Sequence, residues 1–171
     1  VQHSLRNAID NINMPSRLVN NLAQGKFVGA GQEVARFTIK STVGLGGLLD
    51  VAKDGFGIEK SDEDTGQTLG FYGVIPGPYL VLPFLPATDV RDGLGSVVDA
   101  AMNPLNYLIP FAAGADGATT FGALTGIAVT DAVNRRSLNL ETYEGVEETV
   151  VDLYSAVRNG YLQKRETMIE Q

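Results

Sequence analysis

The sequence predicts an all-α protein folded as one domain, and three observations support this prediction. Apolar residues recur at helical spacing in several separate segments. The 171 residues suffice for a single domain, 1–171, with a sizeable core. Charge is uneven, because the 66 residues from Thr65 to Thr130 hold only five charged side chains. The middle of the chain therefore suits a poorly hydrated place, which is either a membrane boundary or, in milder form, the core of a soluble protein.

The composition argues against several classes of protein. The net charge of −7 and the pI of about 4.6 oppose nucleic-acid binding, which requires a basic face. The absence of cysteine removes disulfides, thiolate nucleophiles and zinc–thiolate sites. His3 is the only histidine, so a histidine-based catalytic or metal site is not expected. We therefore predict no cofactor, no metal ion and no catalytic residue.

A stretch of 24 residues, TGQTLGFYGVIPGPYLVLPFLPAT (65–88), carries no charge. About 20 apolar helical residues cross a bilayer core, so the length alone would allow a span. Each proline removes an amide donor and disfavours helix in the preceding residue, so no continuous helix fits. The helix-breaking residues are Gly66, Gly70, Gly73, Pro76, Gly77, Pro78, Pro83 and Pro86. We expect an irregular segment, either inside protein or beside a polar cavity at membrane depth, or a buried crossing loop of a soluble protein.

One or two short helices are expected over residues 4–24. Pro15 suits the first turn of the second helix, and Gly25 is placed to end it. The polar face of these helices, which is expected to meet solvent, consists of Asn7, Asn11, Asn20 and Asn21.

A further helix is expected over about residues 30–42. Its spacing places Val34 and Phe37 on one face and Arg36 and Lys40 on the other. We predict that the apolar pair packs inward and the basic pair points outward.

The sequence VGLGGLLDVA (43–52) places three glycines before a short apolar helix. They are Gly44, Gly46 and Gly47. A phosphate-binding loop needs a following Lys-Ser/Thr or a fully spaced glycine fingerprint after a strand, and neither is present. We therefore expect these glycines to serve close helix packing. The next residues, 53–64, are predicted to form a solvated acidic loop without calcium, since Gly73 stands where the closing glutamate of an EF-hand would lie.

After the uncharged stretch, Thr88 or Asp89 can cap a helix that reaches about Ala101, and Asn103-Pro104 should break it. Its expected inner face consists of Val90, Leu94, Val97 and Val98.

Residues 111–130 contain a single charge, Asp116, which is expected near a helix start. Small residues recur every four positions at Gly114, Ala118, Gly122 and Gly126. Such a ridge lets helices approach closely in lipid, although soluble helix pairs use it too. The length would cross a hydrocarbon core, but the many glycines, alanines and threonines favour partial embedding over a full span.

The last predicted element is a long amphipathic helix over about 140–169. Its expected buried stripe consists of Tyr143, Val146, Val150, Leu153, Val157 and Tyr161. Acidic residues come early and Arg158, Lys164 and Arg165 come late, which complements the helix dipole. The charged face is expected to be solvated, with a docking surface for a basic partner as the alternative.

Four segments closely resemble the VacJ/MlaA lipoproteins of Gram-negative outer membranes. They are RFTIKSTVGLGGLLDVA (36–52), DTGQTLGFYGVIPGPYLVLPF (64–84), the Arg-Asp-Gly at 91–93, and DLYSAVRNGYLQKR (152–165). The resemblance covers essentially the whole chain. It departs from the family pattern at Leu153, where many members carry proline.

The resemblance implies a ring of helices around an amphipathic channel, lying in the inner leaflet of the outer membrane. Such proteins remove phospholipids that have strayed to the outer leaflet and pass them to a periplasmic lipid-binding carrier, usually while bound to trimeric porins. They are also anchored by a lipidated N-terminal cysteine after a signal peptide. The sequence opens VQHSLRN without these features, so we expect it to be truncated at its start.

Within this resemblance, the glycine- and proline-rich segment is our candidate for a lipid gate, with a static loop as the alternative. The candidate gate or lipid-path residues are Gly70, Gly73, Pro76, Gly77, Pro78 and Tyr79. The candidate helix-packing residues at the channel wall are Gly44, Gly46, Gly47, Gly114, Ala118, Gly122 and Gly126. A passive scaffold for porin or carrier remains an alternative function. A lipase is not expected, because no G-x-S-x-G motif occurs.

Overall fold

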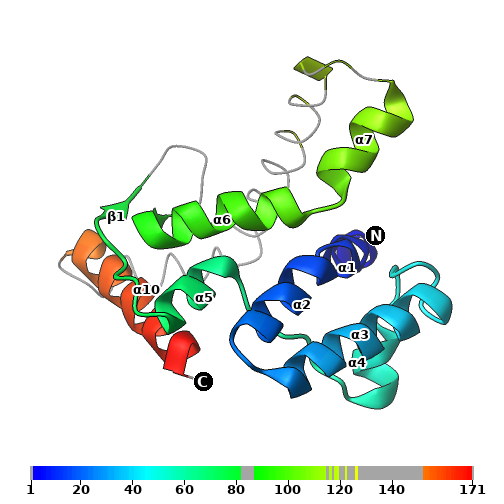
Figure 1. Cartoon of the computed structure of the whole chain (residues 1–171), viewed down its shortest axis with the longest axis horizontal. Coiled ribbons are helices and arrows are strands. Elements are labelled where there is room, and N and C mark those ends of the chain that lie inside the picture. The colour runs from blue at the N-terminus through cyan, green and yellow to red at the C-terminus, as the bar shows by residue number, and fades with distance from the viewer. Residues whose placement is uncertain are drawn as a thin grey trace.

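The computed structural model describes residues 2–81, 87–114, 116, 118–119, 122, 126 and 152–170. In these ranges the protein consists of mostly short helices and one pair of two-residue strands, which confirms the all-α prediction (Figure 1). The elements are α1 (Gln2–Ile12), α2 (Met14–Ala23), α3 (Phe27–Thr42), α4 (Val51–Phe56), α5 (Thr65–Phe71), β1 (Tyr79–Leu80), β2 (Thr88–Asp89), α6 (Val90–Met102), α7 (Leu105–Ala113) and α10 (Leu153–Glu170).

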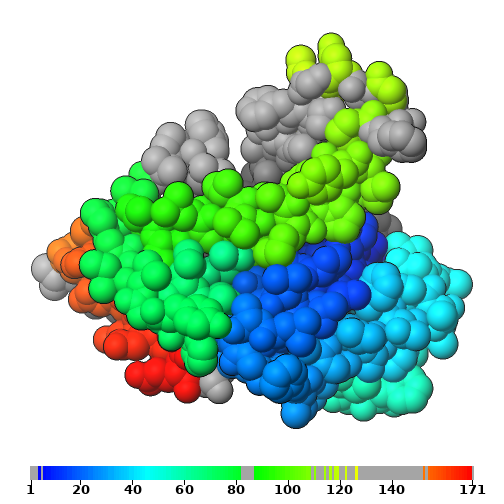
Figure 2. Space-filling view, in the orientation of Figure 1, coloured from blue at the N-terminus to red at the C-terminus, as the bar shows by residue number. Residues whose placement is uncertain are grey.

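The helices form two groups that meet where α5 and α6 lie against α2. In the first group α2 packs on α3, and α3 packs on α4. In the second group α5 packs on both α6 and the C-terminal helix α10. The space-filling view shows the surfaces of α2 and α6 in contact, with α7 continuing beyond the end of α6 (Figure 2). The last helix of the chain thus lies beside segments from its middle.

Local sequence signals set several helix ends as predicted. Two helices occupy the 4–24 region, with Pro15 in the first turn of α2. Asp89 caps α6, since its Oδ1 accepts a hydrogen bond from the backbone N–H of Asp92 at 2.8 Å. The α6 helix ends before Asn103 and α7 begins after Pro104.

The uncharged stretch is more regular than expected. Its first seven residues form α5, so the prediction of an irregular segment is wrong there. Asp64 caps this helix through a 2.8 Å hydrogen bond from Gln67 N, which compensates for the helix-weakening glycines. Residues 72–78 are irregular, and β1 then pairs antiparallel with β2.

The glycine-rich residues 43–49 form turns, and the helix expected within 43–52 begins only at Val51. A Cβ at Gly44 would lie 2.6 Å from the carbonyl oxygen of Leu49, and one at Gly47 would lie 2.8 Å from Cβ of Asn11. Absence of a side chain at these two residues therefore permits the tight turn and its approach to α1.

The single helix expected over 111–130 is wrong at its start. Gly114 has φ +55° and ends α7 in the left-handed conformation typical of helix C-termini. Ala118, Gly122 and Gly126 have helical backbone, while most of their neighbours fall outside the described residues. Asp116 accepts a 2.8 Å hydrogen bond from Thr119 N, as expected for an acid at a helix start.

The long C-terminal helix is described from Leu153, as α10, and runs to Glu170. The first part of the predicted stripe, Tyr143 to Val150, lies outside the described residues. In the parts of the chain that the structure describes, we find no helix with both the length and the apolarity needed to cross a bilayer.

The prediction for the faces of α3 is wrong. Arg36 and Lys40, expected outside, are only 4% and 2% exposed, whereas Val34 and Phe37, expected inside, are 47% and 39% exposed. Helical periodicity separates the two faces of an amphipathic helix, but it does not say which face meets the surroundings. In this protein the apolar face of α3 points outward.

The same inversion occurs in neighbouring helices. Arg91 and Asp92 of α6 are buried, and the face expected inside is exposed at Val90, Leu94, Val97 and Val98. The asparagines expected at the surface are buried at Asn11, Asn20 and Asn21, and Asn7 is half-buried. The predicted helices are present, but several are turned with their polar sides toward the interior.

Candidate functional site

The interior of the described protein is polar. Its buried polar and charged residues are Asn11, Ser16, Asn20, Asn21, Gln24, Glu33, Arg36, Lys40, Thr65, Gln67, Thr68, Asp89, Arg91 and Asp92. Among the described hydrophobic residues, only Ala30 and Ala52 are buried. The core of a water-soluble domain is instead dominated by large aliphatic and aromatic side chains. This interior is therefore suited to hold polar groups away from an apolar exterior.

Charges inside the first helix group are paired. Arg36 donates from Nη2 to both carboxylate oxygens of Asp50, at 3.0 and 2.8 Å, and from Nη1 to the carbonyl of Ile58. Lys40 donates to the carbonyl of Asn7 at 3.1 Å. Burial lowers the pKa of Lys40, although the carboxylate of Asp50 opposes that shift. Pairing allows these charges to be buried.

Glu33 connects α3 to two other segments. It is fully buried, and its two oxygens accept from Arg17 Nε at 2.8 Å and from Ser61 N at 2.7 Å. Arg17 also donates from Nη2 to the carbonyl of Asp10 at 2.8 Å. The polar network thus runs from α1 through α2 and α3 to the loop before α5.

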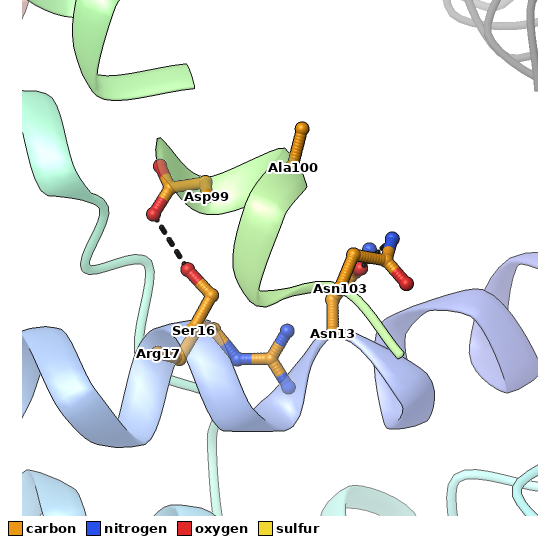
Figure 3. A pocket seen from close by; sticks show the side chains of 6 residues that line it. All are labelled: Asn13, Ser16, Arg17, Asp99, Ala100 and Asn103. Carbon is orange, nitrogen blue, oxygen red and sulfur yellow. Dashed lines mark hydrogen bonds between the residues drawn. The ribbon is translucent and has the colours of Figure 1, made fainter. Parts of the chain in front are cut away.

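A cavity of about 240 Å³ lies between α2 and α6 (Figure 3). It is lined by Asn13, Ser16, Arg17, Asp99, Ala100 and Asn103. Figure 3 shows Ser16 facing Asp99 across the helix interface and Asn13 facing Asn103. The lining offers hydrogen-bond donors, acceptors and both signs of charge.

Asp99 organises one wall of this cavity. Its Oδ1 accepts hydrogen bonds from the hydroxyls of Ser16 and Thr65, both at 2.6 Å, and from Asn20 Nδ2 at 3.1 Å. These donors come from α2 and α5, so Asp99 joins both helices to α6. The wall is consequently held in place by side chains from three elements.

The exterior is apolar over most helices. Exposed large hydrophobic side chains occur on α2, α3, the glycine turns, the irregular segment, α6 and α7. Val28 and Ile75 are each 78% exposed, and Val97 is 67% exposed. Apolar exposure spread over so many elements is typical of a surface that contacts lipid or protein.

The candidate gate residues lie on one continuous stretch from the last turn of α5 to the first residue of β1, and we call residues 70–79 the gate segment. Gly73 has φ +86° and Gly77 has φ +74°, a conformation that favours glycine over other residues. Gly70 is helical and lies close to Ile169 of α10.

Two further contacts fix the later part of the gate segment. The carbonyl of Pro76 accepts a 3.1 Å hydrogen bond from Arg91 N, whereas Pro78 is exposed. The ring of Tyr79 packs against Tyr154 and Tyr161 of α10.

The candidate wall residues are not brought to one place. Gly44 and Gly47 serve the turn described above, and Gly46 (φ +72°) lies between them. The other set, Gly114, Ala118, Gly122 and Gly126, follows α7 and is exposed. The two sets lie on separate parts of the chain, and Gly114 ends a helix instead of opening a ridge.

Sequence reasoning missed a charged cluster at the crossing of α5, α6 and α10. Arg165 donates to both oxygens of Asp64, at 2.7 and 2.8 Å, and its Nε lies 2.5 Å from Asp92 Oδ2. Tyr161 donates to the same Asp92 oxygen at 2.5 Å. The two acids are visible in sequence as helix caps or first-turn residues, but no local signal links them to Arg165.

The profile of the family described as MlaA lipoprotein matches residues 1–168. The chain belongs to the MlaA lipoprotein family. It is 32% identical to an uncharacterized protein of Rickettsia felis, over 99% of this chain and 64% of that protein. It is 34% identical to the intermembrane phospholipid transport system lipoprotein MlaA of Haemophilus influenzae, over 95% of this chain and 62% of that protein.

The Escherichia coli protein of the same name is 28% identical, over 96% of this chain and 62% of that protein. This MlaA-family chain thus spans less than two thirds of the length of these curated relatives. A solved structure described as the structural basis for maintenance of bacterial outer membrane lipid asymmetry superposes on this chain. The TM-score is 0.81 and the sequence identity is 27%. The match covers 98% of this chain and 79% of that chain.

Proposed function

We propose that this chain is the outer-membrane component of intermembrane phospholipid transport. It takes mislocalised phospholipids from the outer leaflet and passes them to a periplasmic lipid carrier, which maintains lipid asymmetry. The observation that carries this proposal is the polar interior beneath an apolar exterior. Membership of a family whose named members belong to intermembrane phospholipid transport systems supports it.

The physical problem in such transport is the lipid head group. Moving a charged group through hydrocarbon costs several kcal/mol or more, so a path needs polar partners. The cavity between α2 and α6 supplies carboxylate, guanidinium, hydroxyl and amide groups. We propose that it forms part of the head-group path of an amphipathic channel, with the acyl chains following apolar surface. The chain acts on the lipid's position and performs no chemistry on it.

The apolar exterior supports a position in the periplasm-facing leaflet of a Gram-negative outer membrane. Membrane-surface helices commonly use basic faces to attract anionic lipid. This chain has a net charge of −7, so apolar embedding must hold it instead, together with a lipid anchor in the full-length protein. The exposed side chains of α3 and α6 are the proposed lipid contacts.

Two kinds of protein partner belong to the proposal. A trimeric porin would hold the chain within the outer membrane, and a soluble lipid-binding protein would collect the phospholipid on the periplasmic side. Both follow from the family resemblance.

The gate segment is proposed to control passage. Gly73 and Gly77 are hinge candidates because their left-handed backbone is available to glycine at little strain. Pro76 and Pro78 stiffen the residues between and after them. A stiff piece between two permissive positions moves as a unit.

The glycines at 44, 46 and 47 and the small residues at 114, 118, 122 and 126 are proposed to allow close packing at the channel wall.

The test is lipid transfer by the full-length protein that contains this chain. The protein is reconstituted in vesicles holding fluorescent phosphatidylethanolamine, and transfer to the soluble carrier is measured. Asn13→Trp should fill the cavity and lower the rate about tenfold, which corresponds to roughly 1.4 kcal/mol on the barrier. Asn13→Ala is the matched control, because it loses the same 2.8 Å hydrogen bond from Asn103 without filling the space.

If the tryptophan and alanine variants transfer lipid at the same rate, the cavity is not part of the lipid path. Absence of transfer by the wild-type protein, with porin and carrier binding intact, would instead favour the passive scaffold.

A further inference from the structure

We infer that the cavity between α2 and α6 selects phospholipids whose head group carries a primary ammonium, such as phosphatidylethanolamine, and that Asp99 is the residue that recognises the ammonium. The inference rests on the proposed function and extends it, because it names the class of lipid that the head-group path favours. The observation behind it is a carboxylate inside the protein that has no cationic partner.

Asp99 differs from the other acidic residues of the interior. Every other described acid that is buried or half-buried forms an ion pair with an arginine or a lysine. The pairs are Asp10–Lys60, Glu33–Arg17, Asp50–Arg36, Glu63–Lys26, Asp64–Arg165, Asp89–Arg91 and Asp92–Arg165. Asp99 is also half-buried, but no arginine or lysine in the described ranges pairs with it.

The hydrogen bonds that Asp99 accepts come from neutral donors. The donors are the hydroxyls of Ser16 and Thr65, the amide of Asn20 and the backbone N–H of Thr65, at 2.6 to 3.3 Å. Such donors favour the ionised carboxylate, but none of them carries a full positive charge. A charge inside a protein is normally paired with a charge of opposite sign. The site therefore suits a cation that the described part of the chain does not supply.

The carboxylate of Asp99 is accessible to a ligand, because it lines the cavity (Figure 3). As far as the chain is described, its Oδ2 accepts one hydrogen bond only, from Thr65 N at 3.1 Å. A carboxylate oxygen has lone pairs for two. A primary ammonium brings three N–H donors and a positive charge, and its hydrogen bond to a carboxylate is roughly twice as strong as one between neutral groups.

Arg17 offers the complementary partner from the α2 side of the same cavity. Its Nε donates to Glu33 and its Nη2 to the carbonyl of Asp10, while none of the described residues accepts from Nη1. A phosphate oxygen can accept a charge-assisted hydrogen bond from this nitrogen. One wall thus suits the phosphate of a zwitterionic head group, and the other suits its ammonium.

The selection comes from the ammonium, because every phospholipid has a phosphate for Arg17. An anionic glycerol head group would leave Asp99 without a cation. The quaternary ammonium of choline has the charge but no N–H to donate. The cavity, about 240 Å³, equals roughly eight water molecules at about 30 Å³ each, which suits a small head group. Ethanolamine satisfies charge, hydrogen bonding and size together.

The test compares two lipids in the transfer assay with the full-length protein. Phosphatidylethanolamine labelled on an acyl chain is compared with its N-acetyl derivative, which carries the same label. Acetylation removes the positive charge of the nitrogen and keeps the phosphate, the glycerol and the acyl chains. The wild type should transfer phosphatidylethanolamine about tenfold faster, the effect of roughly 1.4 kcal/mol on the barrier.

Asp99→Asn changes the protein side of the same contact. The amide oxygen can still accept from the neighbouring hydroxyls, but the negative charge is lost. If Asp99 and the ammonium interact, the two changes are not additive, and the preference of this variant should fall to about one. If Asp99 only joins the three helices, the variant should slow both lipids alike and keep the preference. A preference of the carrier itself is common to both proteins and cancels.

Asp54→Asn is the matched control, because it removes the same charge from an exposed position on α4 that does not line the cavity. It should keep the wild-type preference. Loss of the preference in this variant too would assign the effect to overall charge and overturn the role of Asp99.

A second measurement detects the contact in the wild type and does not depend on how a variant folds. A carbodiimide activates carboxylates, and a primary amine in contact with one forms an amide. After treatment in vesicles of phosphatidylethanolamine, mass spectrometry of peptides should find the lipid joined to Asp99. Vesicles of phosphatidylcholine, which has no primary amine, should give no such product. Lipid joined only to other acids would overturn the inference.

The outcomes separate this inference from the proposed function. If the wild type transfers both lipids at the same rate, or Asp99→Asn keeps the preference, the ammonium site is wrong and the proposed function survives. If the wild type transfers neither lipid while it binds porin and carrier, the proposed function fails and the ammonium site fails with it.

Discussion

At the scale of single residues, Asp92 shows how a carboxylate is kept charged inside this protein. Burial alone would raise its pKa, but hydrogen bonds from Arg165, Tyr161 and Arg91 outweigh that effect and lower it. Asp89, one turn earlier, is fully buried with weaker compensation, and burial raises its pKa. Neighbouring acids in one helix start therefore differ in their electrostatic environment.

The buried hydroxyl of Tyr161 leads to a prediction about how the free energy of unfolding depends on pH. Burial, and then its hydrogen bond to Asp92, raise the pKa of Tyr161 to about 12 from 10.0. In the unfolded chain the phenol ionises near 10.0, so between these values the unfolded state binds fewer protons than the folded state. The stabilisation from the neutral hydroxyl is complete below pH 10.0 and disappears as the pH rises through about 12.

The measurement is the free energy of unfolding by denaturant as a function of pH, for the wild type and Tyr161→Phe. The stability advantage of the wild type over the phenylalanine variant should shrink across that alkaline window. A constant difference would show that the hydroxyl does not carry this contribution.

At the scale of elements, the gate segment runs from the last turn of α5 through two left-handed glycines to a strand residue. Gly73 and Gly77 are exposed, and Pro76 is bound through its carbonyl to the start of α6. The segment is therefore fixed at a few points and exposed between them. A static loop and a hinge share this appearance, so a matched pair of substitutions is needed to separate them.

Gly73→Val and Gly25→Val form that pair. Both glycines have similar left-handed φ values, +86° and +73°, and a Cβ at either one would meet nothing within 4 Å. Each substitution should lower the free energy of unfolding by about 1–2 kcal/mol through backbone strain. Only Gly73→Val should lower lipid transfer, by about tenfold, the effect of roughly 1.4 kcal/mol on the barrier.

Both quantities are measured on the same preparations, by denaturant unfolding and by the vesicle transfer assay. If both variants lose a similar share of lipid transfer, backbone strain anywhere in the fold is sufficient to slow transfer. The proposal that Gly73 is a hinge would then be wrong.

At the scale of the whole molecule, the inverted faces of α3 and α6 define the surroundings that the protein requires. Exposed valine, leucine and phenylalanine side chains cover several elements, while arginine, lysine and aspartate lie inside. Burial of apolar surface drives folding in water, so this distribution is favourable only where the exterior is not water. A membrane or a protein partner must cover the apolar surface.

Val97→Lys tests lipid contact at this scale. Val97 is 67% exposed on α6, and a surface substitution on a water-soluble protein is usually within about 0.5 kcal/mol of neutral. A charge placed among lipid tails instead costs about 2.5–3.5 kcal/mol. Flotation of the chain, expressed with no attached lipid, on phosphatidylethanolamine–phosphatidylglycerol vesicles should therefore fall strongly.

Val97→Leu is the control and should float like the wild type, because it retains an apolar side chain. Unchanged flotation of the lysine variant would place α6 away from the lipid.

The sequence by itself determined the helical class, the family, and several helix ends. Pro15, Asp89 and Asn103-Pro104 act within one or two turns of the chain, so their effects are readable from neighbouring residues. The α5 helix was missed, because its glycines read as breakers while the cap from Asp64 and the support of α6 and α10 outweigh them.

The tertiary structure alone decided which side of each helix faces inward and which residues meet. Periodicity is the same whether an apolar stripe packs on a core or on lipid, so the burial of Arg36 and Lys40 could not be read from spacing. Arg165 lies 101 residues from Asp64, and only the packing of α10 on α5 and α6 brings the two charges together. Local physics sets where helices begin and end, whereas long-range packing in a given solvent sets what they bury.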